Sequence, residues 1–327
     1  MNDYILEVKD LHTSFRSKTD GSITNVLNGV SFGVKKGEIL GVVGESGSGK
    51  SVTMLSVMRL LGKDADIRGE VLLNGENLLD YDERQMRSIR GSRISMIFQD
   101  PMTSLNPVYT IGNQMREIIR LHRRDIEDVN AYAAELLETV GISDGLRHLK
   151  QYPHELSGGM RQRVSIAMAL SSNPDILIAD EPTTALDVTV QAQIIDLIRD
   201  LTKKRNMTTV IITHDLGIIA GLCDSVVVLY AGRLCEKGSV YDIFRSARHE
   251  YTKGLIAAVP NRDATRRLIP IEGTPVNLQA VPDGCAFCAR CKNAMAVCMK
   301  ELPTERQFSP THTAWCWMNE REEAQDD

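Results

Sequence analysis

Apolar and polar side chains alternate along the first part of the chain in a way typical of half-buried strands. The alternation is clearest over residues 4–8 and 26–34, which predicts two strands of one sheet. Phe15 lies between these runs, in a polar segment rich in turn-forming residues. We expect it to be either a core residue or a platform on which a planar ring can stack.

Short apolar runs and helical periodicity predict the elements that follow. We expect a helix at 51–58, which contains no Gly or Pro, and another over 129–140 that Gly141 closes. A mainly helical subdomain is expected at about 100–170, beginning with an irregular segment at 100–107 that two prolines interrupt. Further strands are expected at 38–43, 69–75 (running into an Asn-Gly turn), 94–98, 176–182 and 208–213.

The segment 44–51, GESGSGKS, matches the phosphate-binding template G-x-x-x-x-G-K-[ST] at every defined position. A loop between the end of a strand and the start of a helix directs backbone N–H groups and the positive end of the helix dipole at one point, which suits a polyphosphate. Lys50 then reaches the β- and γ-phosphates, and the Ser51 hydroxyl ligates Mg²⁺. The predicted nucleotide-binding residues here are Gly44, Ser46, Gly47, Ser48, Gly49, Lys50, Ser51 and Val52.

Two buried strands are expected to end in polar side chains that serve the same site. The run 176–182 is an aliphatic strand pattern that ends in two adjacent carboxylates, Asp180 and Glu181, and a continuous aliphatic strand is typical of one buried on both faces of a parallel sheet. Ligands bind at the carboxyl ends of such strands. Asp180 can hold Mg²⁺ through water there, and Glu181 can polarise an attacking water. The strand at 208–213 leads to His214, which we expect to reach the same site.

A third motif is LSGG at 156–159, where Ser157 is a good N-cap for an amphipathic helix. By itself this motif indicates only a well-capped helix. Its spacing from Asp180 strengthens the interpretation of the motif as functional.

Composition excludes several classes of function. With 327 residues, 43% hydrophobic side chains and a net charge of -5, the chain is typical of a globular protein of about two domains with no general attraction to nucleic acid. Asp3, Glu7 and Lys9 make the N-terminus unlike a secretory signal, and no uncharged apolar run is long enough for a membrane span. We expect a cytosolic chain that associates with a membrane only through a partner.

Taken in order, these motifs resemble the ATP-binding subunit of an ABC transporter over about residues 4–260. The resemblance is carried by the loop 44–51, Gln99 after a strand, LSGG at 156–159, Asp180-Glu181, ALD at 185–187 and His214. It implies an α/β fold: a P-loop ABC ATPase cassette at 1–260, with a RecA-like core, an antiparallel β subdomain and the helical subdomain. A small cysteine-rich, metal-binding extension would follow at 261–327.

The resemblance also implies roles for single residues. ATP and Mg²⁺ are the implied ligands, and the implied reaction is ATP hydrolysis. Gln99 would sense Mg²⁺ and the membrane partner, and Ser157, Gly158 and Gly159 would bind the nucleotide held by an opposing subunit. The remaining assignments are adenine stacking for Phe15, Mg²⁺ binding for Ser51, Gln99 and Asp180, general-base catalysis for Glu181, a γ-phosphate switch for His214, and a catalytic set of Glu181, His214, Gln99 and Lys50.

Three further stretches, 98–107, 179–189 and 249–255, resemble the dipeptide, oligopeptide and nickel importer ATPases. The implied protein lies peripherally on the cytoplasmic face of the cell membrane. Its implied partners are a second, different ATPase chain, two integral membrane permease subunits and, indirectly, an extracytoplasmic solute-binding protein. We expect it to power uptake of di- or oligopeptides. The alternatives are import of nickel or another small solute, a non-transport ABC ATPase, and an iron–sulfur redox sensor that only binds nucleotide.

Five of the seven cysteines lie between 285 and 316, which in a cytosolic chain favours metal over disulfides. Their spacing suits either Zn²⁺ or a [4Fe–4S] cluster. The importer ATPases resemble this tail at Cys285, Cys291, Cys298 and Cys316, and they carry a [4Fe–4S] cluster. Cys288 is additional and creates a C-x2-C-x2-C run close to ferredoxin spacing, so which four thiols bind stays open.

Overall fold

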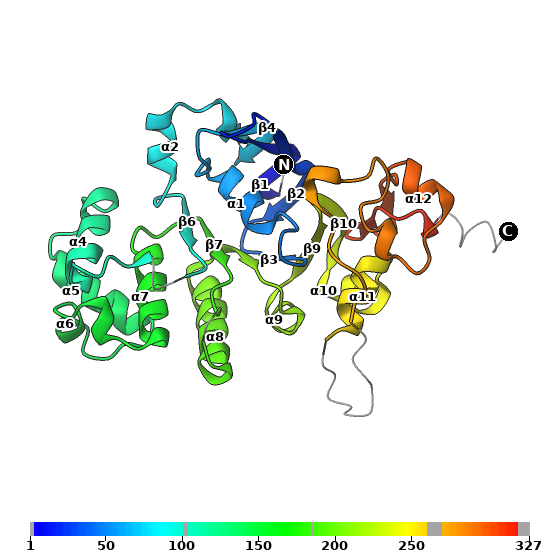
Figure 1. Cartoon of the computed structure of the whole chain (residues 1–327). Coiled ribbons are helices and arrows are strands. Elements are labelled where there is room, and N and C mark those ends of the chain that lie inside the picture. The colour runs from blue at the N-terminus through cyan, green and yellow to red at the C-terminus, as the bar shows by residue number, and fades with distance from the viewer. Residues whose placement is uncertain (1–2, 101–103, 185, 260–269, 320–327) are drawn as a thin grey trace. The chain divides into compact units, whose positions relative to one another are not determined.

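The structure is a computed structural model that describes residues 3–319 except 101–103, 185 and 260–269 (Figure 1). The chain forms two compact units. The first contains Met1–Asp80 and Thr213–Asp327, and the second contains Tyr81–Ile212. Residues 101–103 of the predicted irregular segment, and Ala185 of the ALD motif, lie outside the described residues.

The first unit begins with an antiparallel sheet. Its strand order is β2-β1-β4-β5, and its strands are β1 Tyr4–Arg16, β2 Ile23–Lys35, β4 Ala65–Leu73 and β5 Glu76–Asn77. The predicted strands at 4–8, 26–34 and 69–75 are confirmed. Asn74 and Gly75 have φ values of 50° and 87°, which is the left-handed pair that a two-residue hairpin requires.

The position of Phe15 differs from the prediction. Phe15 lies inside β1 and not in a turn-rich segment between strands. It pairs with Thr24 on β2 and with Ala65 on β4. The turn comes only after it, where the N–H of Ser17 donates to the carbonyl of Ser22 at 2.8 Å. Pairing on both sides of β1 outweighs the polar local composition, since strand preference depends mostly on such neighbours.

A second sheet of the first unit carries strands in the order β11-β12-β10-β9-β3. β3 runs parallel to β9, while the other neighbours are antiparallel. The two short C-terminal strands therefore extend this sheet at β10. The strands are β3 Ile39–Val43, β9 Ser225–Tyr230, β10 Arg233–Ser239, β11 Arg306–Gln307 and β12 Thr313–Ala314.

Helices of the first unit are short, and several begin with side-chain caps. Ser239 caps α10 in a reciprocal capping box with Asp242, and the buried His249 caps α11. The interior is aliphatic: Leu6, Leu27 and Met54 are at most 1% exposed, and full burial of such a side chain stabilises by about 1.5–3 kcal/mol. The helices are α1 Lys50–Val57, α9 Leu216–Leu222, α10 Val240–Ser246, α11 Glu250–Ala257 and α12 Ala296–Lys300.

The second unit combines a parallel sheet of order β8-β7-β6 with six α-helices among its described residues. Every residue of β7 and β8 is buried, which confirms the prediction of strands covered on both faces. The predicted helix at 129–140 is confirmed as α5. The elements are α2 Glu83–Ile89, β6 Ile94–Ile97, α4 Ile111–His122, α5 Val129–Thr139, α6 Gly145–His148, α7 Gly158–Leu170, β7 Ile176–Asp180, α8 Val188–Arg205 and β8 Thr208–Ile212.

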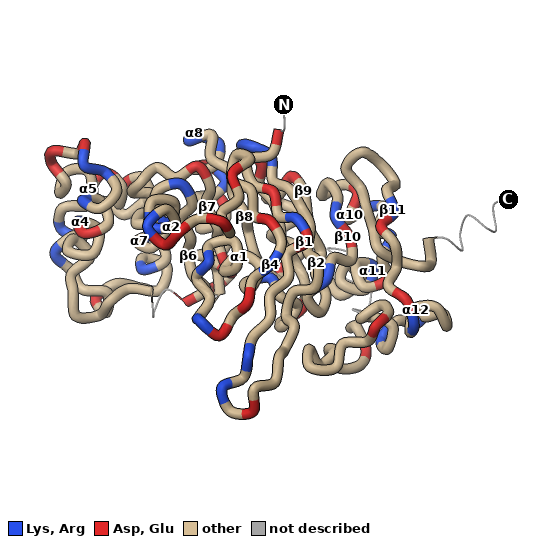
Figure 2. The backbone as a smooth tube through the Cα atoms, turned by 90° about the horizontal axis from the view of Figure 1, so that it is seen from above, with Lys and Arg blue, Asp and Glu red and all other residues tan. Residues whose placement is uncertain are grey.

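Acidic and basic residues are interspersed along the elements of both units (Figure 2). Among the residues that the structure describes, no helix combines the length and the apolar character needed to cross a membrane.

Gly232 provides a test of the turn between β9 and β10. Ala231 and Gly232 both have positive φ, and a Cβ on Gly232 would lie 1.8 Å from the carbonyl oxygen of Val26. We expect Gly232→Ala to lower the free energy of unfolding by about 3 kcal/mol, because backbone strain and a backbone clash add together. Urea unfolding can follow this through Trp315 and Trp317, the two tryptophans of the chain.

Gly21→Ala is the matched control. Gly21 has the same φ of 73°, but no atom lies within 4 Å of the position its Cβ would take. We expect a loss of only about 1 kcal/mol from the left-handed backbone. Equal losses in the two variants would show that the approach to Val26 contributes nothing.

Candidate active site

The loop at 44–51 joins the end of β3 to the start of α1, as the template requires. Gly44 has a φ of 154°, and a Cβ there would lie 2.2 Å from the carbonyl oxygen of Leu229. Only glycine therefore allows the backbone to run this close to β9. The neighbouring turn also holds the loop, since the N–H of Gly232 donates to the carbonyl of Ser48 at 2.9 Å.

Polar groups inside the loop are arranged around a concave backbone. The buried Lys50 ammonium donates to the carbonyls of Gly44 and Glu45 at 2.8 and 2.9 Å. The Ser48 hydroxyl is also buried and has no hydrogen-bond partner among the residues that the structure describes. A buried hydroxyl without a partner is costly, so this atom fits a site where an anion supplies the missing bond. Ser46 and Gly47, at the tip of the loop, are exposed.

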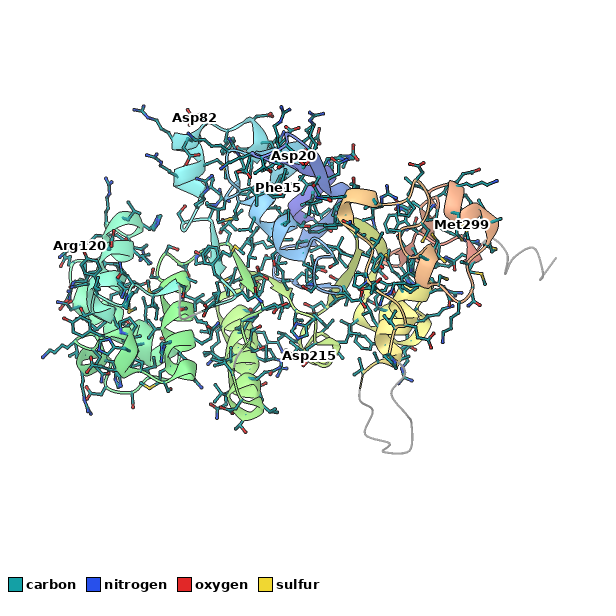
Figure 3. All side chains as sticks on the ribbon, viewed as in Figure 1. Phe15, Asp20, Asp82, Arg120, Asp215 and Met299 are labelled. Carbon is teal, nitrogen blue, oxygen red and sulfur yellow. The ribbon has the colours of Figure 1, made fainter. Side chains whose placement is uncertain are left out.

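Helix α1 is anchored to the antiparallel sheet through buried hydroxyls. Thr13 on β1 and Ser56 on α1 share a hydrogen bond of 2.8 Å. The half-buried Phe15 lies two residues further along the same strand (Figure 3). Ser51 and Val52 are in the first turn of α1, where the helix dipole presents its positive end.

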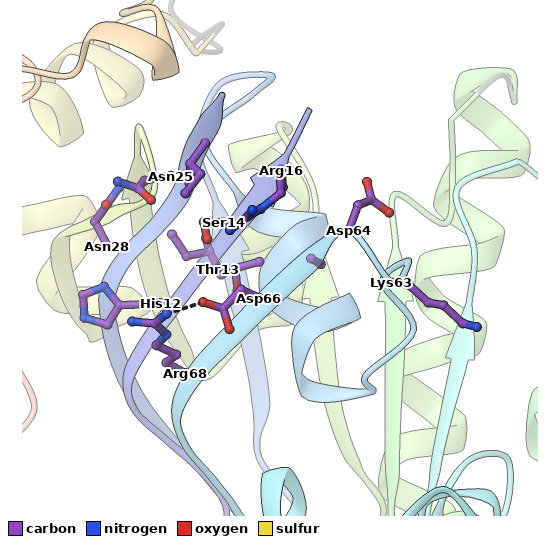
Figure 4. Close-up of a pocket in the computed structure, with 13 residues that line it drawn as sticks. His12, Thr13, Ser14, Arg16, Asn25, Asn28, Lys63, Asp64, Asp66 and Arg68 are labelled. Atoms are coloured by element: carbon purple, nitrogen blue, oxygen red, sulfur yellow. Dashed lines mark ion pairs between the residues drawn. The ribbon is translucent and has the colours of Figure 1, made fainter. Parts of the chain in front are cut away.

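A polar groove of about 920 Å³ is lined by residues on both sides of Phe15 in the sequence, but Phe15 itself does not line it. Figure 4 shows the groove lined mainly by side chains of β1, β2 and β4. His12, Ser14 and Arg16 contribute from β1, and Arg68 pairs with Asp66 at 2.7 Å. No residue of the loop 44–51 lines it. The groove is therefore separate from the phosphate-binding template.

His214 belongs to the first unit together with the phosphate loop. The N–H of Thr213 donates to the carbonyl of Val42 at 3.3 Å, so the segment that leads into His214 lies beside the strand that leads into the loop. Asp215 then caps α9 by accepting from the N–H of Gly217 at 2.7 Å (Figure 3). The His214 side chain is exposed.

In the second unit, the predicted site residues Gln99 and Glu181 are in contact, although they are 82 positions apart in the sequence. The Gln99 amide donates to the Glu181 carboxylate at 2.9 Å, and the Thr184 hydroxyl donates to the same oxygen at 2.9 Å. Glu181 itself has a φ of 45°, which is uncommon for a residue other than glycine and stores backbone strain. Asp180, the last residue of β7, is 5% exposed. Sequence reasoning did not predict the contact from Thr184.

The LSGG motif opens helix α7 as predicted. The Ser157 hydroxyl accepts from the N–H of Met160 at 3.3 Å, and the Arg161 side chain donates to the carbonyl of Leu156 at 3.0 Å. Ser157 is exposed, and Gly158 and Gly159 are half-buried. The helix therefore starts at the surface.

The cysteine-rich tail does not gather its thiols as expected. Among the described residues, no group of three or more His, Cys, Asp and Glu side chains is arranged to hold a metal ion. The predicted ligand set of Cys285, Cys291, Cys298 and Cys316, with Cys288 as a substitute, is therefore not assembled in this structure. Backbone contacts still tie the segment together, since the N–H of Cys285 donates to the carbonyl of Cys298 at 2.8 Å.

Burial explains the chemical state of these thiols. It raises the pKa of Cys285 to about 12 and that of Cys291 to about 11, because the charged thiolate is disfavoured away from water. Neighbouring thiols act in the same direction on both. Burial also raises the pKa of Cys316. Metal binding would release the protons of these three thiols, because a thiol that ligates a metal does so as the thiolate.

The tail is held to the rest of the first unit by other contacts. Phe287 packs against Tyr230 and Tyr251, with ring centroids 5.4 and 5.2 Å apart. The buried Glu236 carboxylate on β10 lies 2.7 Å from the imidazole of His312 in the tail. It also accepts the N–H of His249 at 2.9 Å, so its charge is compensated by hydrogen bonds.

Two residues that sequence reasoning did not assign contact the phosphate loop. The Tyr251 hydroxyl accepts the N–H of Glu45 at 2.7 Å, and Arg290 in the tail forms an ion pair with the Glu45 carboxylate. Arg290 is 245 positions from Glu45. No local pattern could have predicted this pair, because the template leaves the position of Glu45 undefined.

Comparisons with known proteins agree with this geometry. Residues 27–184 match the family described as ABC transporter, and residues 235–298 match the oligopeptide/dipeptide transporter C-terminal region. A probable peptide ABC transporter ATP-binding protein of Sinorhizobium fredii is 50% identical, covering 96% of this chain and 95% of that protein. A dipeptide transport ATP-binding protein of Bacillus subtilis is 47% identical, covering 97% and 95%. An oligopeptide transport ATP-binding protein of Escherichia coli is 46% identical, covering 96% and 93%.

Solved structures agree as well. An ATP-binding cassette determined as a dimer in a post-hydrolysis state, with ADP and phosphate, has a TM-score of 0.64 and 28% identity, covering 72% of this chain and 98% of that one. A component of an ABC transporter complex of Clostridium perfringens has a TM-score of 0.63 and 29% identity, covering 75% and 92%. With its P-loop fold and these full-length relatives, the chain belongs to the ABC transporter ATP-binding proteins, an ATPase family, and it carries the C-terminal region of the oligopeptide/dipeptide transporters.

Proposed function

We propose that this protein is the ATP-hydrolysing subunit of an ABC importer that takes up dipeptides or oligopeptides across the cytoplasmic membrane. The observation that carries the proposal is similarity at 46–50% identity, over at least 95% of the chain, to ATP-binding proteins of peptide transport. The match to the oligopeptide/dipeptide C-terminal region supports the same substrate class.

The phosphate loop is assigned to the ATP polyphosphate. Backbone N–H groups of the loop and the N-terminus of α1 supply positive potential, and Lys50 supplies a full charge. The unpartnered Ser48 hydroxyl supports this assignment. Phe15 is proposed to stack on adenine, on the basis of the resemblance.

Magnesium is assigned to Ser51, Gln99 and Asp180. A hydroxyl, an amide oxygen and a carboxylate are the hard oxygen donors that Mg²⁺ prefers, so the donor set fits this ion. When bound, Mg²⁺ would neutralise charge that develops on the β- and γ-phosphates.

Glu181 is proposed as the general base for the attacking water, and His214 as the residue that responds to the γ-phosphate. The hydrogen bonds from Gln99 and Thr184 to one Glu181 oxygen support this role, because they orient the carboxylate for proton transfer. The strained backbone of Glu181 is typical of a functional position.

The proposed partners follow from the exposed start of α7. Ser157, Gly158 and Gly159 are assigned to a nucleotide held by a second ATPase subunit, which we propose is a different chain. Two helix N-termini would then face one γ-phosphate from opposite sides. Two membrane permease subunits and an extracytoplasmic solute-binding protein complete the proposed importer, and this chain would lie on the cytoplasmic face of the membrane.

Lys50→Ala tests the phosphate loop. We expect weaker MgATP binding and a loss of turnover of about 10²–10³-fold, because a charge that stabilises the transferring phosphoryl group is removed. Nucleotide titration and phosphate release measure the two effects. Lys36→Ala, at an exposed position of the same unit, is the control. Hydrolysis at the parental rate in Lys50→Ala would overturn the assignment.

Glu181→Gln tests the general base. We expect ATP to bind normally while turnover falls by about 10²–10⁴-fold, since the amide cannot accept the proton. Uptake of a labelled dipeptide by vesicles that contain the assembled importer should stop, and ATP should stay trapped between the ATPase subunits. Glu138→Gln, on the exposed side of α5, should leave uptake unchanged. Uptake of nickel in place of the peptide would correct the substrate class.

The spacing of the five clustered cysteines supports a [4Fe–4S] cluster, or Zn²⁺, in the tail as part of this proposal, although the thiols of the structure do not form such a site. Iron, zinc and sulfide per chain after anaerobic purification test it. We expect four irons with matching sulfide in the parent and in Cys288→Ser, and loss of both in Cys285→Ser. Purified chain without iron, zinc or sulfide would reject a metal centre.

A further inference from the structure

The second residue of the phosphate loop, Glu45, is held at three points. Its N–H donates to the Tyr251 hydroxyl at 2.7 Å, and its carbonyl accepts from the Lys50 ammonium at 2.9 Å. Its carboxylate accepts two hydrogen bonds from Arg290, at 2.5 and 3.0 Å. The paired geometry is the strong, directional form of an arginine–carboxylate contact. Glu45 is therefore the residue through which the cysteine-rich tail meets the phosphate loop.

Arg290 is fixed in place by contacts other than Glu45. Its side chain is only 6% exposed, and its Nε donates to the carbonyl of Glu272 at 3.0 Å. The guanidinium lies over the rings of Tyr230 and Phe287, 5.9 and 5.8 Å from their centroids. The hydrogen bonds to Glu45 raise the pKa of Arg290, so the side chain is always charged. A cation that is largely removed from water and held by several contacts can hold a carboxylate in one position.

A carboxylate in this position would oppose nucleotide binding if its negative charge were not paired with a cation. The loop concentrates N–H dipoles and the Lys50 ammonium toward a polyphosphate, and an unpaired negative charge on the same loop repels that ligand. Arg290 cancels this charge. It also keeps the Glu45 carboxylate on the tail side of the loop, while Lys50 holds the Glu45 carbonyl from within.

We propose that Arg290 is a positioning residue for nucleotide binding, which neutralises Glu45 and sets the conformation of the phosphate loop from the C-terminal tail. The proposal rests on the proposed role of the loop in binding ATP. It gives the tail a function in the nucleotide site that does not depend on any metal.

A double-mutant cycle on the full chain tests the proposal. MgATP affinity is measured for the parent, Arg290→Gln, Glu45→Gln and the double variant, at low and high salt. We expect Arg290→Gln to weaken binding about tenfold in the parent and less than about twofold in the Glu45→Gln background, because the repelling charge is then absent. Added salt should recover part of the loss, since it screens the repulsion.

Two further variants separate charge from folding. Arg290→Lys keeps the charge without the paired hydrogen bonds and should retain part of the affinity, because the Glu45 charge is still neutralised while the paired geometry is lost. Lys292→Gln breaks the exposed Lys292–Glu272 pair of the same tail and should leave affinity unchanged. Thermal unfolding of each variant shows whether it is folded.

The outcomes that overturn the proposal are distinct from those that overturn the phosphate-loop assignment. Equal losses from Arg290→Gln in both backgrounds, a loss that salt does not change, or equal losses in Arg290→Lys and Arg290→Gln would reduce Arg290 to a structural role. Parental affinity in Arg290→Gln would reject the proposal while Lys50→Ala still weakens binding. If Lys50→Ala also binds normally, the assignment of the loop itself fails.

Discussion

The close approach of the phosphate-loop backbone to the β9–β10 hairpin is the constraint on which the rest of the site depends. Gly44 lies against the carbonyl of Leu229, and the Ser48 carbonyl accepts the N–H of Gly232. Because no side chain fits at Gly44 or Gly232, the loop and the hairpin hold one another in a single conformation. In that conformation the Lys50 ammonium lies inside the loop, and the buried Ser48 hydroxyl has no hydrogen-bond partner among the described residues.

The same hairpin connects the loop to the C-terminal tail. β10 pairs with β12, which in turn pairs with β11, and the buried Glu236 on β10 contacts His312. Phe287 and Arg290 add aromatic and ionic contacts near the loop. The tail is thus an integral part of the first unit, held by strand pairing and buried polar contacts.

In the second unit, the corresponding constraint acts on the Glu181 carboxylate, which follows a buried strand and is held in place. β7 and β8 are wholly buried, so their position is set by packing, and Glu181, the residue after β7, has a positive φ. Gln99 and Thr184 then orient one oxygen of that carboxylate. Rigid strands with polar ends are a common way to position catalytic groups.

The sequence alone determined the elements whose signals are local: the phosphate loop between a strand and a helix, the buried strand before Asp180, the Ser157 cap and the Asn74-Gly75 turn. Each depends on the period of apolar positions or on residues that few backbone conformations tolerate. Only the tertiary structure decided that Phe15 belongs to a strand, that Gln99 meets Glu181, and that Arg290 meets Glu45. Strand pairing and ion pairs between distant residues leave no periodic trace in a sequence, because they depend on which surfaces the folded chain brings together.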